Sequence, residues 1–211
     1  MGLQEEYFII AEGKSGEIEE KKSRFIANVF SVSSEEEALS HINAVKKKYW
    51  DARHNCYAFI IGKKQELMRC SDDGEPQGTA GKPILEVIKG KELCNVLVVV
   101  TRYFGGTLLG TGGLVRAYTD ATKAGLEASK MAKVISGKRL LLETDYNSVG
   151  KLLYIMGSYG IEPEVTYTDI VEAKVVIKDE LVDRIIKELT EATSGQMKIV
   201  IDGSQELLEE V

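Results

Sequence analysis

Residues 171–201, VEAKVVIKDELVDRIIKELTEATSGQMKIVI, decide the fold of the C-terminal part of the chain. Apolar and polar residues first alternate over residues 171–177, which is the period of a half-buried strand. The apolar spacing then becomes that of an amphipathic helix over residues 179–193, and Gly195 ends it. Residues 197–201 return to a short apolar run. The stretch therefore predicts a strand, a helix and a second strand.

The residues before this stretch complete the pattern. Residues 138–144 (KRLLLET) predict a strand, residues 147–156 a short helix and residues 165–168 a strand that pairs with the next one. The order is then strand, helix, strand, strand, helix, strand, which is the ferredoxin-like βαββαβ arrangement. We expect this domain to cover residues 136–211.

Residues 1–135 predict a separate domain of mixed helices and strands. The unbroken apolar run around residues 95–101 is typical of a central, fully buried strand. Ser33 and Ser34 are each followed three residues later by a glutamate, a capping-box pattern that begins a helix. Further strands are expected before residue 32 and at residues 56–61 and 67–70, and further helices at residues 83–88 and 113–130. The predicted fold class of the whole chain is α+β.

Composition places the protein in a broad class. The chain has 211 residues, 44% of them hydrophobic, and no apolar run approaches the roughly 18 residues that span a bilayer. Its three cysteines form no CxxC pair, which suits a reducing compartment. The first residues carry acids and no basic segment, so a secretory signal is not expected. We expect a cytoplasmic protein without a membrane partner, and the sequence assigns no oligomeric state.

The charge is divided unevenly between the two predicted domains. Residues 1–135 contain 19 basic and 18 acidic side chains, a net charge of +1, whereas residues 136–211 contain 8 and 15, a net charge of −7. Phosphate binding needs an excess of Lys and Arg. Any contact with nucleic acid is therefore expected in residues 1–135.

A glycine-rich segment, residues 103–114, lies between the buried strand and a helix. Free N–H groups at a helix start attract anions, and glycine permits close approach of the backbone. The sequence therefore suggests an anion site; its candidate residues are Lys82, Arg102, Gly110, Thr111, Gly112, Gly113 and Arg116. The spacing matches neither a Walker A motif nor GxGxxG. The alternative is a tight turn with close helix packing at Ala117, Ala121 and Gly125.

The acidic loop of residues 71–83 offers candidates for catalysis. Its carboxylates, which include Asp72 and Asp73, are the kind of oxygen ligand that Mg²⁺ prefers. His54 is a candidate for a general base acting with one of them. The alternative is turn chemistry, with Asp-Gly forming the turn and Thr79 capping the next helix. We predict no metal and no cofactor.

A basic run with aromatic residues is a further candidate surface. Residues 46–50 (KKKYW) end a predicted helix, and Arg53 follows. Cations beside aromatic rings can contact RNA by pairing with phosphates and stacking on bases. Cations are also favoured at a helix C-terminus by the helix dipole, which is the alternative.

Four segments together resemble the IMPACT/YigZ family. They are KSRFIA at residues 22–27, ARHNCYA at residues 52–58, SDDGEPQGTAGKP at residues 71–83, and VVVTRYFGG with LGTGGL at residues 98–114. The C-terminal part resembles the small domain of bacterial YigZ-type members. The resemblance implies a ribosomal protein S5 domain 2-like fold for residues 1–135 and a fold like elongation factor G domain V for residues 136–211.

The resemblance also implies a role linked to translation. Eukaryotic IMPACT proteins regulate translation by competing for the activator of a stress-responsive initiation-factor kinase, and no accepted catalytic residues accompany the motifs. We therefore expect a regulatory binding protein that contacts RNA, the ribosome or translation factors through residues 1–135. The alternatives are an enzyme acting on a phosphorylated substrate at the glycine-rich loop, and an adaptor that binds only proteins.

Overall fold

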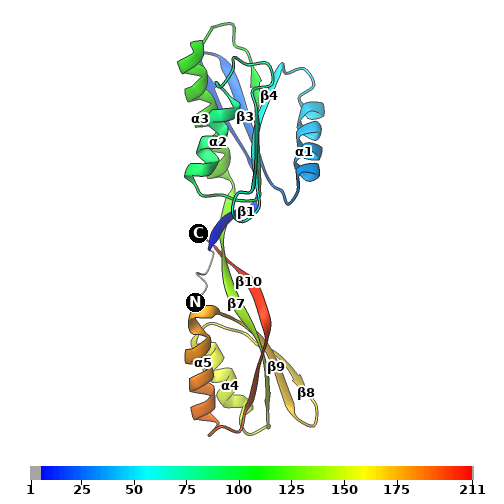
Figure 1. Ribbon diagram of the computed structural model, residues 1–211, viewed down its shortest axis with the longest axis vertical. Helices are drawn as coiled ribbons and strands as arrows, with labels where there is room; N and C mark the ends of the chain where they lie inside the picture. Colours follow the sequence, from blue (N-terminus) through cyan, green and yellow to red (C-terminus); the bar gives the residue numbers. More distant parts are fainter. Residues whose placement is uncertain (1–5, 211) are drawn as a thin grey trace. The chain divides into compact units, whose positions relative to one another are not determined.

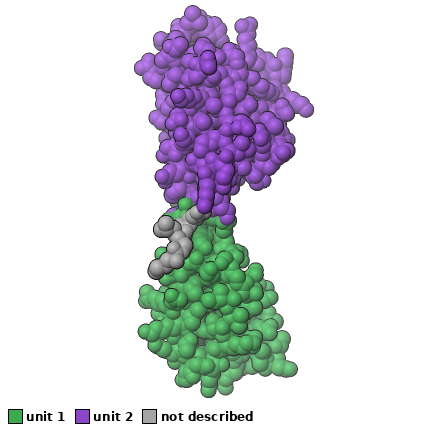
Figure 2. Space-filling view, in the orientation of Figure 1, with its two compact units in different colours: residues 1–6, 134–208 green, residues 7–133, 209–211 purple. Residues whose placement is uncertain are grey.

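The computed structural model describes residues 6–210 of the chain. It divides into two compact units, one built mainly from residues 7–133 and the other from residues 134–208 (Figure 2). These are called the N-terminal unit and the C-terminal unit below. No helix in the described part of the chain is long and apolar enough to cross a membrane.

The N-terminal unit is a five-stranded sheet with helices on both faces (Figure 1). The sheet has the order β2-β3-β6-β4-β5, and its paired neighbours are antiparallel. Its strands are β2 (Ser15–Glu20), β3 (Ser23–Ser31), β4 (His54–Ile61), β5 (Leu67–Ser71) and β6 (Val96–Tyr103). Its helices are α1 (Glu35–Lys48), α2 (Gly81–Gly90) and α3 (Gly110–Ala128).

Strand β6 is the centre of this unit, as its apolar run predicts. Val96, Val98 and Val100 join the core beneath α2 and α3, whereas Leu97 and Val99 join the core beneath α1. Both faces of β6 are therefore covered, because successive side chains of a strand point to opposite faces. The sheet therefore has α1 on one face and α2 and α3 on the other.

Helix α1 begins as the capping-box pattern predicts. The Ser34 Oγ atom accepts a hydrogen bond from the backbone N–H of Glu37. The Glu37 carboxylate accepts in return from the N–H and hydroxyl of Ser33. These bonds satisfy donors that a helix start otherwise leaves unpaired. The apolar positions Ala38, Ile42 and Val45 of this helix are buried.

The C-terminal unit has the predicted ferredoxin-like order. It consists of β7 (Lys130–Thr144), α4 (Val149–Ser158), β8 (Glu164–Tyr167), β9 (Val171–Lys178), α5 (Asp179–Ala192) and β10 (Lys198–Glu210). β9 pairs antiparallel with both β7 and β8, and β10 pairs with β7. A separate apolar core, which includes Leu140, Leu152 and Ile185, lies within this unit. The short strand β1 (Tyr7–Glu12) also pairs with β7.

Three predictions made from the sequence need correction. Thr79 does not cap α2: its hydroxyl donates to the carbonyl oxygen of Pro76, and Ala80 stands at the N-cap position without a side-chain hydrogen bond. β7 begins at Lys130 rather than at residue 138, because Ser129 is already extended and leads directly from α3 into the strand. β10 continues to Glu210, nine residues beyond the predicted run.

Candidate functional site

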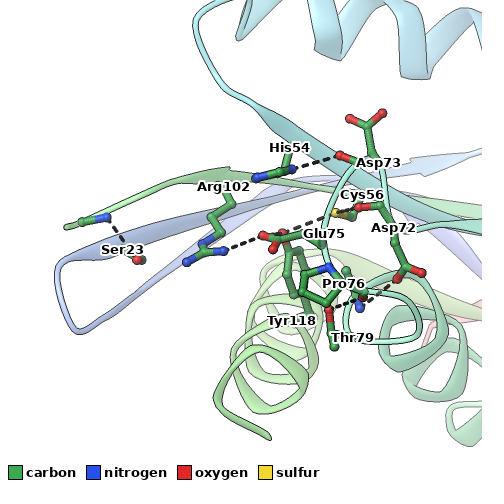
Figure 3. A network of polar contacts seen from close by, with 12 residues as sticks. Ser23, His54, Cys56, Asp72, Asp73, Glu75, Pro76, Thr79, Arg102 and Tyr118 are labelled. Carbon is green, nitrogen blue, oxygen red and sulfur yellow. Dashed lines mark hydrogen bonds and ion pairs between the residues drawn. The ribbon is translucent and has the colours of Figure 1, made fainter. Parts of the chain in front are cut away.

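Residues from the four quoted segments (22–27, 52–58, 71–83 and 98–114) lie together at one end of the N-terminal sheet (Figure 3). Arg102 is paired across the sheet with His54 on β4 and with Phe25 on β3. Gly105, just after β6, donates its N–H to the hydroxyl of Ser23. A Cβ atom at Gly105 would lie about 2 Å from the backbone of Lys22, so this close approach requires glycine.

Arg102 is the centre of a buried polar network. Its Nη1 atom donates to Glu75 Oε1 at 2.7 Å, and the same oxygen accepts from the Tyr118 hydroxyl at 2.8 Å. The Cys56 Sγ atom lies 3.3 Å from that hydroxyl and 2.9 Å from the carbonyl oxygen of Asp72. Arg102 and Glu75 are both buried. This ion pair therefore fixes the acidic loop onto the end of β6 and onto α3.

The network is uncharged apart from that pair. Burial raises the pKa of the Cys56 thiol to about 12, and burial together with the neighbouring Cys56 and Glu75 raises the pKa of Tyr118. Both groups therefore stay protonated near neutral pH. Neither is activated as a nucleophile or as a base.

Asp72 caps helix α2 from outside the helix. Its Oδ1 atom accepts from the N–H groups of Ala80 and Gly81, and its Oδ2 atom accepts from Gly78. Burial raises the pKa of Asp72, but these three hydrogen bonds outweigh burial and lower the pKa overall. The carboxylate thus replaces the cap that the sequence assigns to Thr79.

Asp73 and His54 hold the same loop in place. The Asp73 carboxylate pairs with Lys46 at 2.7 Å and accepts from the N–H of Asn55 at 2.8 Å. The His54 Nδ1 atom lies 3.0 Å from the backbone carbonyl oxygen of Asp73, not from its carboxylate. A carbonyl can only accept, so Nδ1 carries the proton and Nε2 is the free ring nitrogen.

A cavity of about 520 Å³ opens beside this network. We call it the Arg102 pocket, and its lining residues are Asp51, Ala52, Arg53, His54, Arg102, Tyr103, Phe104 and Leu108. The hydroxyl of Tyr103 donates to the Asp51 carboxylate at 2.7 Å. Phe104 and Leu108 are strongly exposed, 55% and 83%. Cationic and apolar side chains therefore share one cavity.

The residues that the sequence groups into one anion site lie in three places. Arg102 lies in the pocket just described, paired with Glu75. Lys82 lines a different cavity of about 620 Å³, a groove formed by residues of α2 and α3. The first turn of α3 lines neither cavity; it consists of Gly110, Thr111, Gly112 and Gly113. Arg116, which is exposed further along α3, also lines neither cavity. The side of α3 that faces the sheet is buried at Ala117, Ala121 and Gly125. This is the close helix packing that the sequence offers as the alternative to an anion site.

The basic run at the end of α1 is exposed. We call Lys47, Lys48, Trp50 and Arg53 the basic–aromatic surface. The Trp50 side chain is 83% exposed, and Lys48 lies over the Tyr49 ring at 5.0 Å. Lys46 belongs to the loop network instead, through its pair with Asp73.

Two residues of the network escaped the sequence analysis. Glu75 lies in the acidic loop but has no sequence signal that separates it from Asp72 and Asp73, and Tyr118 fits the apolar spacing of its helix. Their partners are 27 and 43 residues away, so no local pattern reveals the contacts. The described residues contain no group of three or more His, Cys, Asp or Glu side chains arranged to hold a metal ion.

Comparison with known proteins gives matches along most of the chain. The model of the Impact N-terminal domain matches residues 21–126, and that of a domain of unknown function, DUF1949, matches residues 142–196. The IMPACT family member YvyE of Bacillus subtilis is 38% identical over 92% of this chain and 89% of its own. The IMPACT family member YigZ of Escherichia coli is 36% identical over 65% of this chain and 68% of its own.

A solved structure shares the fold. It is described as the crystal structure of a hypothetical protein, and it matches with a TM-score of 0.61 and 30% identity. The match covers 95% of this chain and 99% of the other. Both units therefore occur together in a known structure.

Proposed function

The chain belongs to the IMPACT family, and we propose that it is a translation-linked regulatory protein that contacts ribosomal RNA through its N-terminal unit. The observation that carries the proposal is the exposure of Trp50 between Lys47 and Lys48 on one side and Arg53 on the other. A tryptophan that is 83% exposed contributes little to folding, so its position suits an external partner.

The chemistry of this surface fits single-stranded RNA. An indole ring can stack on any unpaired base, which contributes about 1–3 kcal/mol per base, while Lys and Arg pair with phosphates. Lys47, Lys48 and Arg53 have no acidic partner among the described side chains, so their charges are available. The net charge of −7 on residues 136–211 disfavours the other unit as the RNA-binding surface.

Co-sedimentation with ribosomes tests the proposal. We expect the protein to pellet with ribosomes at about 50 mM salt and to dissociate as salt rises. Three phosphate contacts predict a loss of affinity of about 20-fold on going to about 200 mM, because each contact to a single strand adds about −0.7 to the logarithmic slope. Absence from the pellet at low salt would overturn the proposal.

Matched variants locate the contact. Trp50→Ala and the double variant Lys47→Ala, Lys48→Ala should each weaken pelleting severalfold. Tyr154→Ala and Lys187→Ala, which remove an exposed aromatic and an exposed cation from the C-terminal unit, should not. If all four variants behave alike, the contact lies elsewhere.

Two alternatives predict different results. A protein-only adaptor would keep its partner after nuclease treatment, whereas an RNA contact would be lost. An enzyme acting on a phosphorylated substrate at Gly110–Gly113 would turn over such a substrate. The enzyme hypothesis needs Lys82 and Arg102 to bind the phosphate together with the first turn of α3. It has less support because these two residues line different cavities.

A further inference from the structure

One side of the Arg102 guanidinium group, formed by its Nε and Nη2 atoms, makes no hydrogen bond within the described chain. Its Nη1 atom is taken by Glu75, and the rings of Phe25 and Phe104 lie 5.4 and 5.6 Å from its Cζ atom. The Nε atom is buried and has no hydrogen-bond partner among the described residues. The structure also gives no partner to Nη2 within the described chain. Nε and Nη2 form one fork of parallel N–H donors.

An unpartnered donor at this position is unusual. Arg102 is only 6% exposed, and buried N–H groups in folded proteins nearly always have a partner. Leaving one unpaired destabilises the folded protein, and more so when the group is charged. Because Arg102 also lines the cavity of about 520 Å³, an acceptor that enters this cavity could satisfy the fork.

The other polar groups of the Arg102 pocket favour an anion. Arg53 is exposed at its wall, and His54 is a second wall residue, whose Nδ1 atom lies 3.0 Å from the Asp73 carbonyl oxygen. The one carboxylate of the wall, Asp51, accepts a hydrogen bond from the Tyr103 hydroxyl on one oxygen, and it shares the wall with the cationic side chains of Arg53 and Arg102. A fork of two N–H groups matches two oxygens of a phosphate in spacing and direction.

The apolar part of the wall indicates what carries the phosphate. Phe104 and Leu108 are 55% and 83% exposed in the same cavity that contains Arg102. Exposed aromatic rings beside cations are the arrangement on which nucleic-acid bases stack. We propose that the Arg102 pocket binds a nucleotide: its phosphate contacts the Nε–Nη2 edge of Arg102, and its base contacts Phe104. The nucleotide is either free or part of an RNA chain, and the second case rests on the function proposed above.

Direct binding to the full-length protein tests this proposal. The probes are inorganic phosphate, adenosine 5′-monophosphate, and an eight-nucleotide RNA with either a 5′-phosphate or a 5′-hydroxyl. Calorimetry gives the affinities, and the ¹⁵N-edited NMR signal of the Arg102 Nε–H group reports the contact. We expect this signal to move when adenosine 5′-monophosphate binds, and binding to be weaker for phosphate alone.

Two variants test the phosphate contact and the base contact of the nucleotide separately. Arg102→Lys keeps the positive charge opposite Glu75 but removes the fork, and it should weaken binding of adenosine 5′-monophosphate at least about tenfold. Phe104→Ala changes an exposed side chain, so folding should persist, and it should weaken binding of the nucleotide but not of inorganic phosphate. Arg69→Lys and Tyr154→Ala are the matched controls and should change neither.

The outcomes distinguish this proposal from the previous one. Tight binding of adenosine 5′-monophosphate identifies a free nucleotide, and a preference for 5′-phosphorylated RNA identifies the end of a chain; both support the pocket. If no probe binds, or if Phe104→Ala and Arg102→Lys leave binding unchanged, the pocket proposal fails. In that case ribosome co-sedimentation that depends on Trp50 would still stand, because Trp50 does not line the Arg102 pocket.

Discussion

At the scale of single residues, Glu75 and Arg102 form a buried ion pair within the N-terminal unit. The side chains are 3% and 7% exposed. Glu75→Gln leaves the charge of Arg102 buried without its counter-ion, and breaking a buried pair in this way costs about 3–5 kcal/mol. We expect the free energy of unfolding, measured by urea denaturation, to fall by about that amount.

An exposed glutamate provides the control. Glu86 forms an (i, i+3) pair with Lys89 on the surface of α2, and such pairs contribute about 0–1 kcal/mol. Glu86→Gln should therefore change the stability by less than about 0.5 kcal/mol. Equal effects of the two substitutions would show that the buried pair has no special role in stability.

The sequence predicts single residues where their partners are local. Ser34 and Glu37 are three residues apart, so the capping bonds of α1 follow from the sequence. Glu75 and Arg102 are 27 residues apart, and only the folding of the loop onto β6 brings them together. For this reason the sequence identified Arg102 as a candidate anion ligand but did not identify Glu75 as its partner.

At the scale of elements, the start of helix α2 depends on a side chain from the preceding loop. Asp72 accepts three N–H bonds there, two on one oxygen and one on the other. Asp72→Asn removes the charge and one acceptor oxygen, so we expect a loss of about 1 kcal/mol, as for other N-terminal caps. Asp120→Asn, on the exposed face of α3, should have little effect.

The effect of Asp72→Asn should depend on pH. The pKa of Asp72 in the folded protein is below its ordinary value of 3.8, so the ionised carboxylate stabilises the fold above that pH. This stabilisation is lost as the pH falls through the folded pKa. The difference between the two proteins in urea denaturation should therefore be full at pH 7 and smaller at pH 3. A difference that is constant from pH 7 to pH 3 would exclude a role for the charge.

Elements with a buried face were predictable, and the exposed extensions of strands were not. β6 and β9 have clear apolar patterns because they contribute to the cores. Residues 202–206 of β10 are exposed on every side, so no alternation marks them as a strand. Pairing with β7 and exposed side-chain contacts, such as the ion pair between Arg139 and Asp202, extend β10, and sequence periodicity reports neither.

At the scale of the whole molecule, the two units have separate cores. The residues buried beneath α2 and α3 or beneath α1 all come from the N-terminal unit, and those of the ferredoxin-like core all lie between Leu140 and Met197. Periodicity predicted two folded regions for this reason, since each core needs its own set of apolar faces.

Separate cores predict separate effects of mutation. Ile84 and Leu142 are 0% and 1% exposed, one in each unit, and replacing either with alanine should cost about 2–5 kcal/mol because it leaves a cavity. Calorimetry of the full-length protein should show two unfolding transitions, with Ile84→Ala lowering the midpoint of one and Leu142→Ala that of the other. If both substitutions shift a single common transition, the two cores unfold as one cooperative body and the division into independent units is wrong.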